Sequence, residues 1–217
     1  MSGIVRWELY FELALREYKN TYHGSILGQL WITLGFGIFV AIVGSLYTFI
    51  LKVDAETYLP FFCAGIINWR FISNIISEGC MVFQKSRQYI LGFDMPFSIF
   101  IYRSLIRACI SFVYLFFVYL LIGIIFKVEI GLSVLFFIPG IMLVLLNSFW
   151  IMMILGIVCL RYPDIGHVIN SITILLFFIT PVFWPPDMVE KYKYLAIYNP
   201  FYHYLEVMRD PLIGVMP

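Results

Sequence analysis

The sequence predicts an all-α, polytopic helical membrane protein that crosses the bilayer five times. Of its 217 residues, 62% are hydrophobic and only 12% are charged, whereas an average soluble domain carries about 25% charged residues. Apolar stretches recur with the length of about 20 residues that a helix needs to span the hydrocarbon layer. They lack the period-two alternation of barrel strands, so helices are expected. A net charge of +1 also argues against nucleic acid as a partner.

Charged residues mark the ends of the five predicted spans. Four of the apolar stretches carry no charge, and the fifth holds only Arg70. We therefore expect a single transmembrane domain over residues 1–217, with a segment of 185–217 that follows the last span. The predicted spans cover about 29–51, 58–78, 105–126, 132–159 and 167–184, within an overall transmembrane region of 29–184.

Residues 1–23 precede the first span and are predicted to form an amphipathic helix. They contain three acidic residues and no small-residue cleavage site after an apolar core, so they are not a signal peptide. At helical spacing, Trp7, Phe11 and Tyr18 share an apolar face, and the charged residues fall on the other side. Such a helix lies in the membrane interface or packs against a partner at that level.

The distribution of Lys and Arg predicts a cytoplasmic N-terminus. With the N-terminus inside, eight of these residues fall on the cytoplasmic side and five outside, and Arg70 lies within the membrane. Positive residues favour the cytoplasmic side in short loops. Five spans then place residues 185–217 outside.

The sequence contains no motif that predicts catalysis. It lacks the G-x-x-x-x-G-K-[ST] phosphate loop, the G-x-S-x-G elbow and the H-E-x-x-H zinc motif, and its four cysteines form no C-x-x-C pair. Asp164 and His167 lie close together on a predicted loop, but Asp164 fits better as a cap of the next helix. We therefore expect no catalytic residue, metal or cofactor in this chain.

The connection over residues 79–104 is longer than a simple link between two spans requires. It contains an amphipathic segment in which Lys85, Arg87 and Asp94 are mixed with apolar residues, and Gly92 and Pro96 end it. Such a segment either docks in a groove of a soluble partner or lies on the lipid headgroups.

Arg70 and the aromatic residues are the remaining features that point to function. Arg70 lies near the middle of the second span, where a charge costs several kcal/mol and normally turns inward, toward an anionic substrate or backbone carbonyl groups. Aromatic residues, 19% of the chain, are frequent in spans one and five. Their faces suit the binding of sugars, although packing and lipid contact explain many aromatic residues in membrane helices.

Five segments, in order along the chain, resemble the ABC-2 type transport permeases of the polysaccharide-export branch, which export O-antigen, capsule or teichoic acid. They resemble the start of that family's first span, the end of its cytoplasmic coupling segment, the loop before its fifth span, the end of that span and its outer re-entrant segment. The segments are residues 16–31, 91–96, 161–165, 178–185 and 199–214.

The resemblance implies a transport subunit of the bacterial cytoplasmic (inner) membrane that works as a homodimer with two separate ABC ATPase subunits. Those subunits bind ATP and Mg²⁺, and the cargo is a lipid-linked polysaccharide such as the O-antigen of lipopolysaccharide. The implied ATPase-coupling residues are Tyr89, Ile90, Leu91, Phe93, Asp94, Pro96 and Phe97. The implied channel-lining residues are Trp31, Phe36, Phe39, Tyr47, Arg70, Phe177 and Phe178. Arg161 and Asp164 belong to an implied cytoplasmic gate loop.

The sequence departs from this family at two points. The family fold has six spans, and residue 217 falls where the sixth is expected to begin, so the last span is predicted to be missing. Residue 35 is Gly where the family often has Pro. Two alternatives stay open: an ABC-2 permease for a small molecule or lipid, and a membrane enzyme that acts on a polyprenyl-linked substrate.

Overall fold

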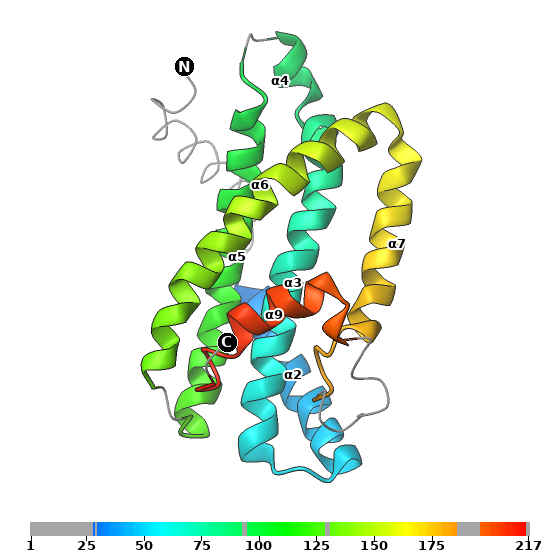
Figure 1. The fold of residues 1–217 in the computed structure, drawn as a ribbon. Coiled ribbons are helices and arrows are strands. Elements are labelled where there is room, and N and C mark those ends of the chain that lie inside the picture. The colour runs from blue at the N-terminus through cyan, green and yellow to red at the C-terminus, as the bar shows by residue number, and fades with distance from the viewer. Residues whose placement is uncertain (1–27, 29, 93–94, 129–130, 186–195, 216–217) are drawn as a thin grey trace. The chain divides into compact units, whose positions relative to one another are not determined.

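The computed structural model describes residues 28, 30–92, 95–128, 131–185 and 196–215. Within them, every regular element is a helix and there is no strand (Figure 1), which confirms the all-α class. The predicted N-terminal helix lies outside the described residues, as do Phe93 and Asp94. The helices are α2 (Leu30–Leu51), α3 (Ala55–Lys85), α4 (Arg87–Gly92), α5 (Ser98–Ile125), the 3-10 helix η1 (Leu132–Phe136), α6 (Phe137–Arg161), α7 (Pro163–Ile179) and α9 (Pro200–Arg209).

Four helical segments of the described chain are long and apolar enough to cross a membrane. They are Leu30–Leu51, Ala55–Gly92, Ser98–Ile125 and Leu132–Arg161. They coincide with the first four predicted spans and make the chain a multi-pass membrane protein. The fifth predicted span overlaps α7, an apolar helix of 17 residues that is about 25 Å long at 1.5 Å per residue.

The long connection predicted over residues 79–104 is largely helical instead. Helix α3 continues to Lys85, and α5 already begins at Ser98. Charged residues end an apolar stretch in the sequence but do not end a helix when their side chains find partners. Glu78 accepts hydrogen bonds from Lys85, two turns further along α3, and from Arg107 of α5.

Helix α7 also differs from the predicted span of 167–184, because it begins at Pro163 and ends at Ile179. Proline is well suited to the first helical position, where its missing N–H would have no partner. The residue before a proline is driven away from helical backbone angles. Thr180 precedes Pro181, so the helix ends there although the chain stays apolar as far as Trp184.

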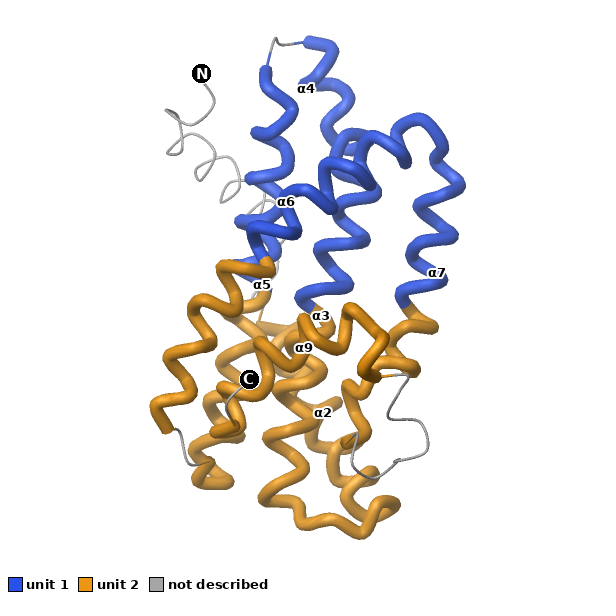
Figure 2. Tube along the Cα trace, viewed as in Figure 1, with its two compact units in different colours: residues 1–28, 71–111, 145–173 blue, residues 29–70, 112–144, 174–217 orange. Residues whose placement is uncertain are grey.

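The chain divides into two compact units (Figure 2). Unit 1 comprises residues 1–28, 71–111 and 145–173, and unit 2 comprises residues 29–70, 112–144 and 174–217. Helices α3, α5, α6 and α7 each contribute residues to both units. Each unit is described by itself below.

In unit 1, the C-terminal half of α3 packs closely against α6. A Cβ atom added to Gly156 of α6 would lie 2.7 Å from Cδ2 of Phe83 and 2.8 Å from Cγ1 of Val82. Small residues at such points let two membrane helices approach closely. Gln84 of α3 adds a polar link, because its Nε2 donates a hydrogen bond to the Cys159 carbonyl at 2.7 Å.

In unit 2, one narrow stripe of α2 is buried and most of the helix surface is exposed. The buried residues Phe36, Val40 and Gly44 recur every four positions, which places them on one face. A Cβ on Gly44 would meet the side chains of Leu59 and Phe62 of α3. Since the exposed part of α2 is apolar, it is suited to lipid or to another membrane chain.

Candidate functional site

The predicted ATPase-coupling segment follows the end of α3 and presents apolar side chains to its surroundings. Tyr89, Leu91 and Phe97 are 47%, 76% and 52% exposed, and no residue of α4 is buried. Pro96 is exposed and Ile90 is half-buried. Exposed apolar residues grouped in this way are typical of a surface that another protein covers.

Arg103 of α5 holds the coupling segment in place within unit 1. This arginine is only 7% exposed, and its Nη2 donates a hydrogen bond to Oγ of the buried Ser86 at 2.9 Å. Its guanidinium carbon lies 5.7 Å from the ring centre of Tyr89 and 5.4 Å from that of Phe100. A cation over an aromatic face is attractive, so Arg103 connects α4 to α5.

One further contact attaches the same segment to α3, and an ion-pair cluster next to it joins α3 to α5. The ring of Phe97 meets the buried ring of Phe83 edge to face, with centres 5.5 Å apart. The half-buried Glu78 carboxylate accepts a hydrogen bond from Lys85 at 2.8 Å and another from Arg107. Arg103 and Phe97 thus attach the coupling segment to α5 and α3 within unit 1.

The predicted gate residues lie where α6 meets α7. Arg161 ends α6, its guanidinium carbon lies 5.9 Å from the Tyr162 ring centre, and Tyr162 alone separates the two helices. Asp164 is part of the first turn of α7, not of a loop as the sequence predicted. A carboxylate in that turn interacts favourably with the positive end of the helix dipole. Both residues are exposed.

Four of the predicted channel-lining residues belong to one aromatic network in unit 2. Phe62 of α3 connects Phe39 and Tyr47 of α2, with ring centres 6.3 and 6.4 Å away. Phe183 lies 5.4 Å from Tyr47, 5.5 Å from Phe177 and 6.2 Å from Phe178. We call this the aromatic network; its members are Phe39, Tyr47, Tyr58, Phe62, Trp69, Phe177, Phe178 and Phe183.

The other predicted channel residues occupy different environments. Trp31 lies in the first turn of α2 and is 62% exposed. Phe36 is 2% exposed, and the Arg70 guanidinium carbon lies 5.1 Å from its ring centre. Arg70 itself is exposed on unit 2. A charged residue at this depth faces a protein interior or a water-filled space in membrane proteins.

Buried polar contacts fix α9 within unit 2. Asn199 caps the helix, because its Oδ1 accepts a hydrogen bond from the Phe201 N–H at 2.9 Å, and its Nδ2 donates to Oγ1 of Thr180 at 2.8 Å. Arg209 is 3% exposed, and its Nη1 donates to the Pro181 carbonyl at 2.7 Å. These contacts join α9 to the residues that follow α7.

Sequence reasoning alone did not find the residues that connect these sites. Phe62 and Trp69 were not among the predicted channel residues, and Arg103, Arg107 and Arg209 were counted only as loop charges. Each makes at least one contact with a residue that is distant in the chain, and a single sequence carries no signal for such pairs. The aromatic abundance of spans one and five was the one usable signal, and it led to Tyr47 and Phe177.

The fold and these sites define a multi-pass helical membrane protein with an exposed segment suited to a partner. The chain belongs to the ABC-2 type transporter family, whose profile matches residues 8–213. It is therefore a membrane permease, a transport subunit without a catalytic domain of its own, and not the polyprenyl-modifying enzyme left open above. ABC-2 permeases work with ABC ATPase subunits.

Three similar proteins support the same family. The chain is 21% identical, over 206 residues, to an O-antigen export system permease protein RfbA of Klebsiella pneumoniae, covering 94% of this chain and 80% of that protein. It is 22% identical to the RfbA protein of Myxococcus xanthus over 182 residues, covering 84% and 70%. A second RfbA protein of Klebsiella pneumoniae is 22% identical over 196 residues, covering 89% and 76%.

Proposed function

We propose that this chain is the permease of an exporter that moves a lipid-linked polysaccharide across the bacterial cytoplasmic membrane. Separate ATPase subunits bind ATP and Mg²⁺ and supply the energy. The distant relatives named above are O-antigen export permeases, which supports this cargo class. The observation that carries the proposal is the aromatic network, because it connects residues of α2 and α7 through Phe62 and Phe183.

In the proposed arrangement, α7 is the fifth span, the N-terminus is cytoplasmic and two copies of the chain enclose the path. One ATPase docks on the coupling segment of each copy. The exposed Tyr89, Leu91 and Phe97 support this docking. The exposure of Arg70 supports a position next to the path, since a charge in contact with lipid tails would be costly.

Weak and repeated contacts suit the passage of a long glycan. An aromatic ring offers an apolar face to a sugar ring without fixing its hydroxyl groups, so successive units find similar surfaces. A site that bound one unit tightly would stop the chain, because binding must be weak enough for the cargo to leave. We expect the network to reorganise when the ATPases move the coupling segment.

Export of a surface glycan in a host that lacks its own O-antigen permease tests this function. The host carries the chain with its ATPase partner and the enzymes that assemble the glycan, and surface glycan is measured by antibody labelling. We expect export by the natural chain and at least a fivefold loss for the double variant Tyr47→Ala with Phe177→Ala. The control is Phe49→Ala, since Phe49 is 84% exposed.

The protein level and the amount of co-purified ATPase are measured in each variant, so that loss of folding is recognised. Unchanged export by a well-folded double variant contradicts the aromatic path. A complex that exports no glycan, but whose ATPase activity is stimulated by a small amphiphile, contradicts the polysaccharide cargo and favours the small-molecule or lipid permease.

A further inference from the structure

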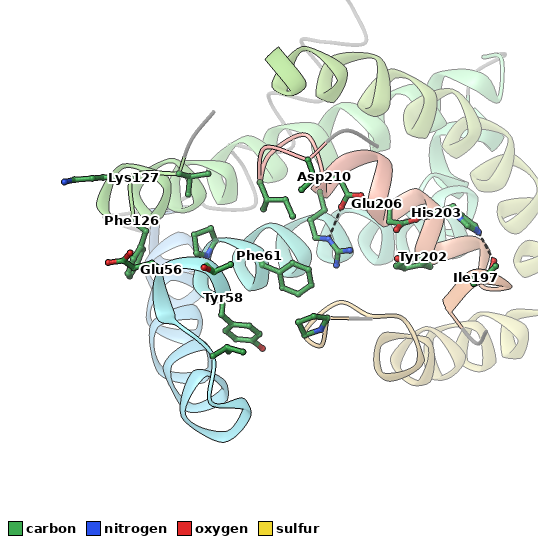
Figure 3. Close-up of a pocket in the computed structure, with 18 residues that line it drawn as sticks. Glu56, Tyr58, Phe61, Phe126, Lys127, Ile197, Tyr202, His203, Glu206 and Asp210 are labelled. Atoms are coloured by element: carbon green, nitrogen blue, oxygen red, sulfur yellow. Dashed lines mark hydrogen bonds and ion pairs between the residues drawn. The ribbon is translucent and has the colours of Figure 1, made fainter. Parts of the chain in front are cut away.

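A cavity of about 930 Å³ lies within unit 2, between the first turns of α3, the end of α5 and α9 (Figure 3). Its volume falls in the range of small-molecule sites, about 300–1,000 Å³. Tyr58 and Phe61 come from α3, while Tyr202 and Glu206 come from α9. The predicted channel residues do not line it. It adjoins the aromatic network, because Tyr58 belongs to both.

The charged groups of the cavity that are available to contact an occupant are carboxylates and not cations. Arg209 is already engaged: its Nη1 donates to the Pro181 carbonyl, its guanidinium carbon lies 4.3 Å from the Phe61 ring centre, and its Nε is 3.5 Å from Asp210 Oδ1. Lys127 is the other cation among the lining residues and is exposed. Glu56 is exposed, and the Glu206 side chain is 30% exposed, so both carboxylates are accessible to an occupant. Glu206 also lies near another lining residue, because its Oε2 is 3.6 Å from Nδ1 of His203.

The aromatic groups of the cavity complement these carboxylates. Tyr202 is half-buried on α9, one turn before Glu206. Burial first, and then the Glu206 carboxylate, raise the pKa of the Tyr202 phenol above its ordinary value. The phenol therefore keeps its proton, which it donates to Glu206, and its ring offers an apolar face to an occupant. Phe126, which directly follows α5, adds a further apolar ring.

This combination selects a class of occupant. Carboxylate oxygens accept hydrogen bonds from hydroxyl groups and repel an anionic occupant. Arg209 and Asp210 are paired with each other. Glu56 and Glu206 then outnumber Lys127 among the lining residues, with His203 counted as neutral. Aromatic faces bind the apolar side of a sugar ring. An acyl chain would leave the carboxylates desolvated and without partners, which is costly.

We propose that this cavity binds neutral hexose units of the exported glycan. The inference rests on the proposed function and on the proposed orientation, which puts the ends of α2 and α5 and the start of α3 on the outer side of the membrane. A sugar held there has already crossed the bilayer. Binding at this point opposes the return of the glycan while the ATPases reset.

The test measures oligosaccharide binding to the purified permease–ATPase complex in lipid nanodiscs. The probes are heptasaccharides of glucose, galactose or mannose, and uronic-acid heptasaccharides of the same length. Binding is followed by saturation-transfer difference NMR and quantified by calorimetry. We expect at least one neutral probe to bind and the uronic-acid probes to bind at least tenfold more weakly.

Variants of the cavity locate the binding site. Glu206→Gln removes a charged acceptor and is expected to weaken neutral binding about tenfold. Tyr202→Ala removes ring and hydroxyl, with a larger expected loss, whereas Tyr202→Phe keeps the ring and is expected to retain most of the binding. The matched controls are Asp54→Asn and Tyr198→Ala, because both residues are exposed and neither lines the cavity. Thermal unfolding of each complex shows whether it has folded.

Three outcomes overturn the inference: no neutral probe binds, acidic probes bind equally well, or the folded Tyr202→Ala and Glu206→Gln variants bind like the natural chain. Export is measured in parallel with the assay described above. If the complex exports glycan but binds no neutral probe, the result contradicts the sugar site in the cavity and agrees with the proposed export function. If the complex binds neutral probes in a way that depends on Tyr202 but exports no glycan, the result supports the cavity site and contradicts the proposed export function.

Discussion

At the scale of single residues, a few polar side chains hold the apolar helices in defined positions. Asn199 accepts a hydrogen bond from a backbone N–H at the start of α9 and donates one to Thr180, so one side-chain amide provides partners for two polar groups. Arg209 does the same for the Pro181 carbonyl and the Phe61 ring. In apolar surroundings an unpaired polar group is costly, so such contacts define which packing is adopted.

The first residue-scale prediction concerns Asn199. Asn199→Ala removes the cap and leaves the buried Thr180 hydroxyl without its donor, and we expect a loss of about 2 kcal/mol in stability. For a chain of this size that corresponds to a fall of roughly 4–8 °C in its unfolding temperature. Thermal unfolding in detergent, followed by circular dichroism, measures it. Asn199→Ser keeps a capping oxygen but is too short to reach Thr180, so an intermediate loss is expected.

The second residue-scale prediction compares two glycines in helices. Gly156→Ala places a methyl group 2.7 Å from Phe83 Cδ2, and overpacking of this kind costs about 1–3 kcal/mol. Gly123→Ala places the same methyl group where nothing lies within 4 Å, and it gains up to about 1 kcal/mol in helix propensity. We expect opposite shifts in unfolding temperature. Equal shifts would contradict the close packing of α3 on α6.

At the scale of helices, the sequence predicts the elements well and their ends poorly. The first four spans agree with α2, α3, α5 and α6 because their apolar stretches are long. The end of α3 was missed because Glu78 and Lys85 were counted as breaks, although they pair with each other. The end of α7 was missed because the sequence stays apolar beyond Pro181. The helix ends there because of the backbone angles that a proline imposes, and hydropathy does not report them.

In the candidate sites too, features that depend on local sequence patterns were predictable, and contacts between residues distant in the chain were not. The exposed Leu91 and Tyr89 were predictable, because an amphipathic segment and its breakers are local patterns. Their attachment through Arg103 was not, since Ser86 and Arg103 meet only when α3 and α5 are side by side. The aromatic network was likewise only half predicted: its members on α2 and α7 were found, and Phe62 between them was not.

The prediction at this scale concerns the coupling segment. Leu91→Asp places a charge on a side chain that is 76% exposed, so the fold of unit 1 is expected to tolerate it. If an ATPase covers Leu91, the buried charge is expected to cost at least about 2 kcal/mol of binding, typical of an interface hot spot. We expect the co-purified ATPase to fall more than tenfold. Tyr198→Asp is the control, and equal recovery with both variants would contradict docking on this segment.

At the scale of the whole molecule, function depends on which side of the membrane each site faces. ATP is available in the cytoplasm, so the coupling segment must lie there if ATPases dock on it. The ends of α2 and α5 then lie on the opposite side, together with the cavity lined by Tyr202 and Glu206. The bias of Lys and Arg residues favours this orientation.

Cysteine labelling in intact cells measures that orientation. The natural Cys63, Cys80 and Cys159 are buried, and Cys109 is replaced by Ser, so the background is low. We expect Tyr198→Cys to react with a membrane-impermeant maleimide in intact cells, because residue 198 is 84% exposed and lies outside in the proposed orientation. Gln88→Cys, exposed beside the coupling segment, is expected to react only after the membrane is opened. The reverse pattern would place the coupling segment outside, where no ATPase binds, and would contradict the transport mechanism together with the position assigned to the sugar cavity.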